Sequence, residues 1–135
     1  MEKTLTLFLR IGGRAGLMTL LHHFYADVRQ HQTIGPIFNS QIKNWPEHIE
    51  TIADFWSQIT GGPAGYAGRM PERHLPFGLR EEHFQAWLDL WDFNCRRQLA
   101  PAEANELTTY ARQIGQRLLQ ILQTKKMDEP SGPGS

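Results

Sequence analysis

Three side chains with a polar tip fall on helix faces that are otherwise apolar, where such groups can bind a small ligand. His48, Ile52 and Trp56 are spaced by four residues, so they share one stripe of a helix. Tyr25 and Trp87 lie on the inward sides of two other predicted helices. An unpaired polar group in an apolar interior costs about 1–3 kcal/mol, so each needs a partner or a ligand. An apolar pocket with a few convergent polar groups is typical of a small-molecule or cofactor site.

A structural interpretation of the same residues stands beside this one. His48 could be partly exposed at the edge of its helix, and Tyr25 and Trp87 could be core aromatics bonded to nearby backbone. Other chemistries lack a pattern: the histidines and Cys95 do not have the spacing of a short zinc motif such as HExxH. No GxSxG turn is present to carry Ser-His-Asp catalysis.

The stretch "RMPERHLPFG", residues 69–78, places His74 in an irregular segment between two helix-patterned segments. Residues 61–78 contain eight glycines and prolines, so they predict an ordered loop rather than a helix. A loop of this length inside a compact domain calls for a functional explanation. The question it raises is what His74 contacts.

The elements that position these residues are predicted to be helices. Apolar residues step by three and four over 14–31, from about residue 44 to the "GGP" at 61–63, over 80–99, and from Pro101 onward, where the apolar positions include Leu107, Tyr110, Ile114 and Leu118. Segment 4–10 suits a short helix or an extended arm, and "TIGPIFN" at 33–39 is predicted to be a turn broken by Gly35-Pro36. We therefore expect an all-α domain of four substantial helices and minor ones.

Composition bounds the class of protein. The 135 residues suit one domain, predicted over 1–124, with a disordered tail of linker composition over 125–135. Lys+Arg and Asp+Glu are both 14 and no basic patch stands out, which argues against nucleic-acid or anionic-membrane partners. No apolar run reaches the roughly 20 residues that span a bilayer, so a soluble cytoplasmic protein is expected. The single cysteine, Cys95, excludes an intrachain disulfide and faces the predicted core.

Five stretches, in order, carry a family resemblance. They are "IGG" before the first long helix, "HHFYADVRQHQTIGPIFN", "WPEHIETIADFW", "GGPAGY" and "RHLPFGLREEHFQAWLDLW". Together they resemble the bacterial truncated haemoglobins over residues 5–122. "FY…GPIFN" and "EHxxxIxxFW" are most similar to the third group of that family, while "IGG" and "GGPxxY…RHLPF" are similar to the second.

The resemblance implies a two-over-two helical sandwich with a reduced first helix and a mostly irregular segment carrying the iron ligand. It assigns His74 as the proximal ligand of a haem b iron. Tyr25 and His48 would then lie on the distal side, with Ile52 as an apolar wall. A histidine and a tyrosine near the sixth coordination position also leave open that one of them ligates ferric iron.

The resemblance further implies that the Trp87 indole N–H reaches the bound ligand and that Phe38 packs on the haem face. Oxygen, nitric oxide, carbon monoxide and cyanide are the expected ligands, with an unknown reductase as partner. Donors such as a tyrosine O–H and a tryptophan N–H stabilise a ligand that carries partial negative charge, so they predict slow release. Slow release suits nitric-oxide or peroxide detoxification, or ligand sensing, better than delivery.

Two other functions remain as alternatives at this stage. One is a haem enzyme with true turnover, such as a nitric-oxide dioxygenase or a peroxidase. The other is a cofactor-free helical interaction module, in which Tyr25 and His48 would be structural.

Overall fold

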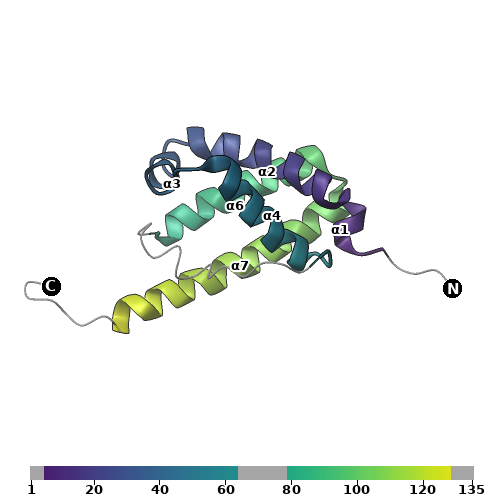
Figure 1. Ribbon diagram of the computed structural model, residues 1–135. Helices are drawn as coiled ribbons and strands as arrows, with labels where there is room; N and C mark the ends of the chain where they lie inside the picture. Colours follow the sequence, from purple (N-terminus) through teal and green to yellow (C-terminus); the bar gives the residue numbers. More distant parts are fainter. Residues whose placement is uncertain (1–4, 64–78, 129–135) are drawn as a thin grey trace, which may run out of the picture.

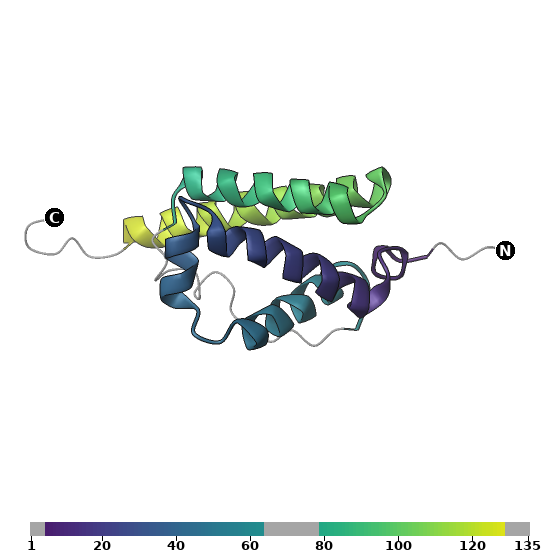
Figure 2. The same cartoon turned by 90° about the horizontal axis from the view of Figure 1, so that it is seen from above.

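Six helices form the part of the chain that the computed structural model describes, residues 5–63 and 79–128, and no strand occurs among those residues (Figure 1). The helices are α1 (Leu7–Arg10), α2 (Gly13–Gln30), α3 (Gly35–Gln41), α4 (Trp45–Ile59), α6 (Glu81–Gln98) and α7 (Pro101–Asp128). The main packing pairs are α2 with α4, α6 with α7, and α2 with α6. Figure 2 shows α6 and α7 side by side over α2 and α4. The predicted two-over-two, all-α architecture is confirmed, with α1 and α3 as the minor helices.

The start of α4 follows from its sequence. The Asn44 side chain accepts a hydrogen bond from the Glu47 N–H at 3.1 Å, which satisfies one of the donors left free at a helix start. Pro46 is tolerated in the first turn because that position needs no N–H. Glu47 places negative charge at the positive end of the helix. The predicted start near Asn44 is therefore confirmed, and it fixes the register of His48 and Ile52.

The prediction of a turn over 33–39 is wrong, because α3 begins there. Pro36 lies in the first turn of α3, where a proline starts a helix instead of breaking one. A Cβ on Gly35 would lie 2.8 Å from the Arg29 carbonyl oxygen, so glycine allows α3 to start against the end of α2. Phe38 is buried as a result of this close approach.

Trp91 lies at the centre of the core and contacts three of the other helices. Its ring stacks on Trp56 of α4 at 4.6 Å between centroids, and Phe24 of α2 meets it edge-on at 5.0 Å. Its indole N–H donates to the Leu107 carbonyl of α7 at 3.2 Å. One side chain on α6 thus joins both layers of the sandwich.

The contact between α6 and α7 differs from the predicted one in one respect. Tyr110 was predicted to face the interior but is 37% exposed, whereas Ala104 and Ala111 are fully buried along with Leu107. Small side chains let two helices approach closely, so alanines occupy the contact. The predicted burial of Cys95 is confirmed.

Two sequence predictions concern the ends of the domain and its surroundings. The predicted boundary at residue 124 falls within α7, which extends to Asp128, and residues 129–135 lie outside the described part of the chain. The division into a domain and a tail stays a prediction. None of the described helices is both long and apolar enough to cross a membrane.

Candidate functional site

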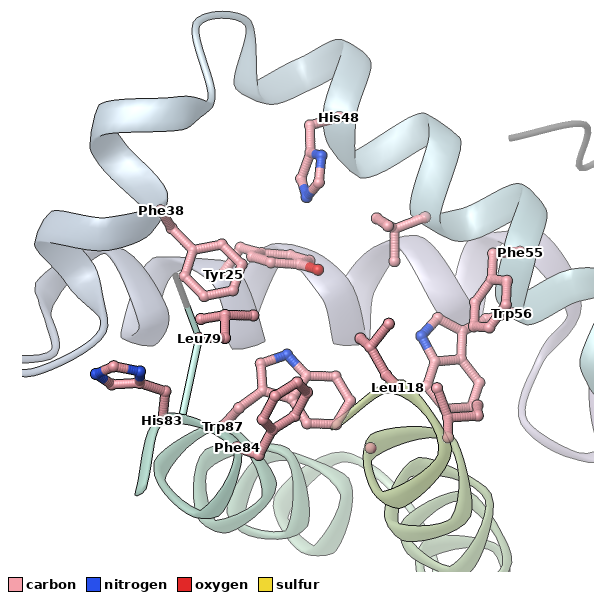
Figure 3. Close-up of a pocket in the computed structure, with 13 residues that line it drawn as sticks. Tyr25, Phe38, His48, Phe55, Trp56, Leu79, His83, Phe84, Trp87 and Leu118 are labelled. Carbon is pink, nitrogen blue, oxygen red and sulfur yellow. The ribbon is translucent and has the colours of Figure 1, made fainter. Parts of the chain in front are cut away.

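A largely apolar pocket lies between the two layers of helices (Figure 3). The space between its walls amounts to about 650 Å³, a figure that includes open solvent at the mouth. Helices α2, α3, α4, α6 and α7 all contribute to it. The lining residues are Tyr25, Phe38, His48, Ile52, Phe55, Trp56, Leu79, His83, Phe84, Trp87, Ile114, Gly115 and Leu118.

Five of the six residues that the sequence singled out meet in this pocket. Tyr25, Phe38, His48, Ile52 and Trp87 come from four helices and all line it. The sixth, His74, lies outside the described residues. Residues far apart in the sequence thus line one pocket.

Tyr25 supplies a neutral hydroxyl to the pocket. The residue is 4% exposed, and Figure 3 shows its oxygen directed toward the space below the His48 ring. The two rings meet edge-on with centroids 5.3 Å apart. Burial raises the pKa of Tyr25 far above its ordinary value, because the phenolate would lose its hydration. The hydroxyl therefore keeps its proton across the physiological pH range and can donate it to a ligand.

Trp87 supplies the second donor, from the opposite layer. Figure 3 shows its indole nitrogen facing the same space as the Tyr25 hydroxyl. Trp87 stacks on Trp91 with an angle of 3° between rings and centroids 5.9 Å apart, and Phe24 meets it edge-on at 5.7 Å. These two contacts restrict the plane of the indole. The direction of its N–H is therefore set by the core rather than by a ligand.

The two donors differ from the donor buried in the core. Trp91 donates its N–H to the Leu107 carbonyl. Within the described part of the chain, no hydrogen bond joins the Tyr25 hydroxyl or the Trp87 N–H to a protein group. Polar groups that face an apolar pocket without a protein partner are arranged to meet a ligand.

The α4 side of the pocket presents one imidazole among apolar groups. The His48 ring packs edge-on against both Tyr25 and Trp45, the latter at 5.6 Å. Ile52 lies one helical turn beyond His48 and extends the apolar wall. The Arg29 guanidinium lies over the Trp45 ring, 4.8 Å from its centroid. Trp45 therefore supports both His48 and Tyr25 from outside the pocket.

Sequence reasoning missed several lining residues. His83 was given no role, yet it lines the pocket, and its Nδ1 accepts the Arg80 N–H at 2.9 Å at the start of α6. This bond leaves the Nε2 of a neutral His83 as a donor. The position of His83 three residues after Arg80, at a helix start, was the available signal for that bond. Gly115 of α7 carried no signal, since periodicity describes side chains and not their absence.

The matched family is bacterial-like globin, and the match covers residues 6–113. The chain belongs to the bacterial-like globin family. It is 36% identical over 80 residues to the Group 3 truncated hemoglobin ctb of Campylobacter jejuni, covering 54% of this chain and 61% of that protein. It is also 33% identical over 81 residues to the Group 2 truncated hemoglobin YjbI of Bacillus subtilis, covering 56% of this chain and 59% of that one.

Solved structures agree with the family. The group III truncated hemoglobin from Campylobacter jejuni has a TM-score of 0.77 and 27% identity to this globin, over 82% of this chain and 91% of that one. The resemblance inferred from five sequence stretches is thus confirmed. The chain spans about 61% of the length of the curated Campylobacter relative and about 59% of that of the Bacillus relative.

Haem is the cofactor of this globin family, and the pocket fits it. The walls are aromatic and aliphatic, as a flat porphyrin requires, and the Tyr25 and Trp87 donors face the interior where a ligand would lie. No group of three or more His, Cys, Asp or Glu side chains that could hold a metal ion occurs within residues 5–63 and 79–128.

Proposed function

We propose that this globin binds oxygen and other small ligands at the iron of a haem b held in the pocket between the two helical layers. The observation that supports the proposal is the pair of donors, the Tyr25 hydroxyl and the Trp87 N–H, which face one apolar space from opposite layers. When bound, a haem would supply an iron centre that can coordinate a small ligand. The side chains of the protein bind the cofactor and stabilise the ligand.

The proposed proximal ligand is His74, by its place in the family motif. A neutral imidazole is a good axial ligand, and its second nitrogen can donate to a carbonyl or carboxylate that orients the ring. Phe38 and Ile52 provide the apolar contacts to the porphyrin, and His48 lies on the same side as Tyr25.

The two donors determine what kind of ligand is held and for how long. Tyr25 and Trp87 can each donate one hydrogen bond to a ligand with partial negative charge. A hydrogen bond to a charged group contributes about 1.5–3 kcal/mol, so loss of one donor is expected to speed dissociation by roughly tenfold or more. Dissociation from the intact site is therefore slow. Slow release supports a role in nitric-oxide or peroxide detoxification, or in sensing, with an unidentified reductase.

The first experiment is a set of visible absorption spectra of the purified protein, as isolated, after dithionite and with carbon monoxide. We expect a Soret band that shifts to that of a histidine-ligated carbonyl form. A second arm replaces His74 with glycine and uses His22→Ala, an exposed position in α2, as the control. A folded His74→Gly variant with unchanged haem affinity and spectrum would show that His74 is not the iron ligand.

A third arm tests the donors. Tyr25→Phe and Trp87→Phe are each expected to raise the rate of oxygen or cyanide dissociation by about tenfold or more. Tyr110→Phe is the matched control, because Tyr110 is exposed on α7. Unchanged dissociation rates in both pocket variants would show that the donors do not contact the ligand.

Turnover is a separate measurement. An enzyme that removes nitric oxide or peroxide must consume many equivalents per haem when supplied with a physiological reductant. Consumption that stops at one equivalent would favour binding or sensing instead.

A further inference from the structure

Gly115 is a buried glycine in the interior of the longest described helix, where glycine is unfavourable. Compared with alanine, a glycine inside a helix lowers the folding equilibrium constant by roughly fivefold. Its φ lies outside the left-handed region, so the backbone conformation does not require glycine. Some other requirement must therefore favour the absence of a side chain at position 115.

The neighbouring atoms of the described residues, 5–63 and 79–128, do not explain the glycine. A Cβ built on Gly115 would meet, among the described residues, only the Phe84 Cδ1 within 4 Å, at 3.7 Å, which is an ordinary van der Waals distance. Gly62 shows the contrast, since a Cβ there would lie 2.6 Å from the Phe8 ring. At Gly16 a Cβ would collide with the Ile11 carbonyl. Helix packing thus explains those two glycines but not Gly115.

Gly115 lines the pocket proposed to hold haem. Ile114 and Leu118 of α7 line the same pocket, as does Phe84 of α6, whose ring lies beside Gly115, 3.7 Å from a Cβ built there. Gly115 and Phe84 also line a more polar groove on the outside of the α6–α7 pair, which includes Asp89 and Arg112. A side chain at position 115 would therefore occupy either the pocket or this outer groove, and the two cases have opposite consequences for a bound cofactor.

We propose that Gly115 is a clearance position for the cofactor: the missing side chain lets the porphyrin plane approach the backbone of α7 and sets how bulky a flat ligand the pocket accepts. This inference rests on the proposed haem function. It explains why the chain tolerates a less stable helix at this point, since the space gained is used only when the cofactor is bound.

The test measures the stability of the cofactor-free protein and its retention of the cofactor separately. Gly115→Ala and Gly115→Leu are compared with wild type for the urea midpoint of the cofactor-free protein and for the rate of haem transfer to excess apomyoglobin. Binding of iron-free protoporphyrin IX is measured in parallel, because that probe cannot bond to His74 and so reports packing alone. Thr109→Ala is the matched control: it raises the helix propensity of α7 at an exposed position.

We expect Gly115→Ala to raise the urea midpoint of the cofactor-free protein while speeding haem loss about tenfold and weakening protoporphyrin binding to a similar extent. Gly115→Leu should lose haem faster still. Thr109→Ala should raise the midpoint and leave haem loss unchanged.

Two results would overturn the inference alone. Wild-type rates of haem loss in both Gly115 variants would place the added side chain in the outer groove. A lowered midpoint of cofactor-free Gly115→Ala would mean that protein packing requires the glycine. If wild-type protein takes up neither haem nor protoporphyrin, the proposed function fails first and this inference fails with it.

Discussion

At the scale of single residues, the interior holds two acidic groups in their neutral forms. Burial raises the pKa of the Cys95 thiol to about 12, with a further contribution from the nearby Asp92 carboxylate. Burial alone raises the pKa of Tyr25 above its ordinary range. Both groups keep their protons in the folded protein at pH values where the unfolded chain would lose them. For Tyr25 this keeps a donor in the pocket, whereas for Cys95 it removes thiolate reactivity.

The consequence is a loss of stability in alkali. Above the ordinary thiol pKa of 9.0 the unfolded chain binds fewer protons than the folded protein, so the free energy of unfolding falls as the pH rises toward 12. Each such group contributes a slope of about 1.4 kcal/mol per pH unit. Cys95→Ala should flatten this dependence in urea unfolding of the cofactor-free protein between pH 8 and 11. Identical slopes for wild type and Cys95→Ala would contradict the assignment.

Some of the pocket residues could be predicted from the sequence and others could not. Tyr25, His48 and Trp87 were identifiable because each is a polar group at helical spacing on an apolar face. Their proposed roles came from the family motifs and not from spacing. His83 was given no role from the sequence, because its place on the wall of the pocket follows from how α6 packs against the other helices.

At the scale of elements, α4 is the helix whose register matters most to the pocket. It carries His48, Ile52 and Trp56 in steps of four, and its start is held by the Asn44 cap. A shift of one residue would rotate His48 by about 100° away from the pocket. The cap therefore stabilises the helix and also specifies which side chain faces the ligand.

Removing that cap has a defined cost. Asn44→Ala should lower the free energy of unfolding by about 1 kcal/mol, because the Glu47 N–H loses its acceptor. Asn44→Asp should retain most of the stability, since a carboxylate also caps a helix start. Chemical denaturation of the three proteins checks this. Equal losses in the alanine and aspartate variants would show that the side-chain bond contributes nothing.

The helices also differ in how well their starts could be predicted from the sequence. The caps and prolines around α4 and α7 act locally, so the sequence predicted both helix starts. The start of α3 depends on Gly35 lying against the carbonyl of Arg29, a contact between two elements that no local pattern encodes. For the same reason the burial of Ala111 in place of Tyr110 could not be read from periodicity alone.

At the scale of the whole molecule, Trp91 links the two layers and supports the pocket from behind. It stacks on both Trp56 and Trp87, which line the pocket, and it bonds to the Leu107 carbonyl of α7. Global stability and pocket geometry therefore share one side chain.

Trp91→Phe should reveal both functions. We expect a loss of about 2–3 kcal/mol in the free energy of unfolding, from reduced packing and an unpaired Leu107 carbonyl. Cyanide should also dissociate faster, although the Trp87 donor remains, because the indole of Trp87 is no longer held in plane. Urea denaturation and stopped-flow dissociation measure the two effects. Trp45→Phe is the comparison for stability, since Trp45 is only partly buried. A Trp91→Phe variant that releases cyanide at the wild-type rate would show that Trp91 does not hold the Trp87 donor in place.

The same arrangement gives the protein an optical property of its own. The chain has four tryptophans: Trp56 and Trp87 line the pocket, Trp91 stacks on both, and Trp45 contacts the rings of Tyr25 and His48. Haem absorbs light in the range where tryptophan emits, so every fluorophore lies close to an acceptor once the pocket is filled. Intrinsic fluorescence should therefore be bright in the cofactor-free protein and nearly dark after one equivalent of haemin, which makes the emission a built-in gauge of occupancy that needs no label.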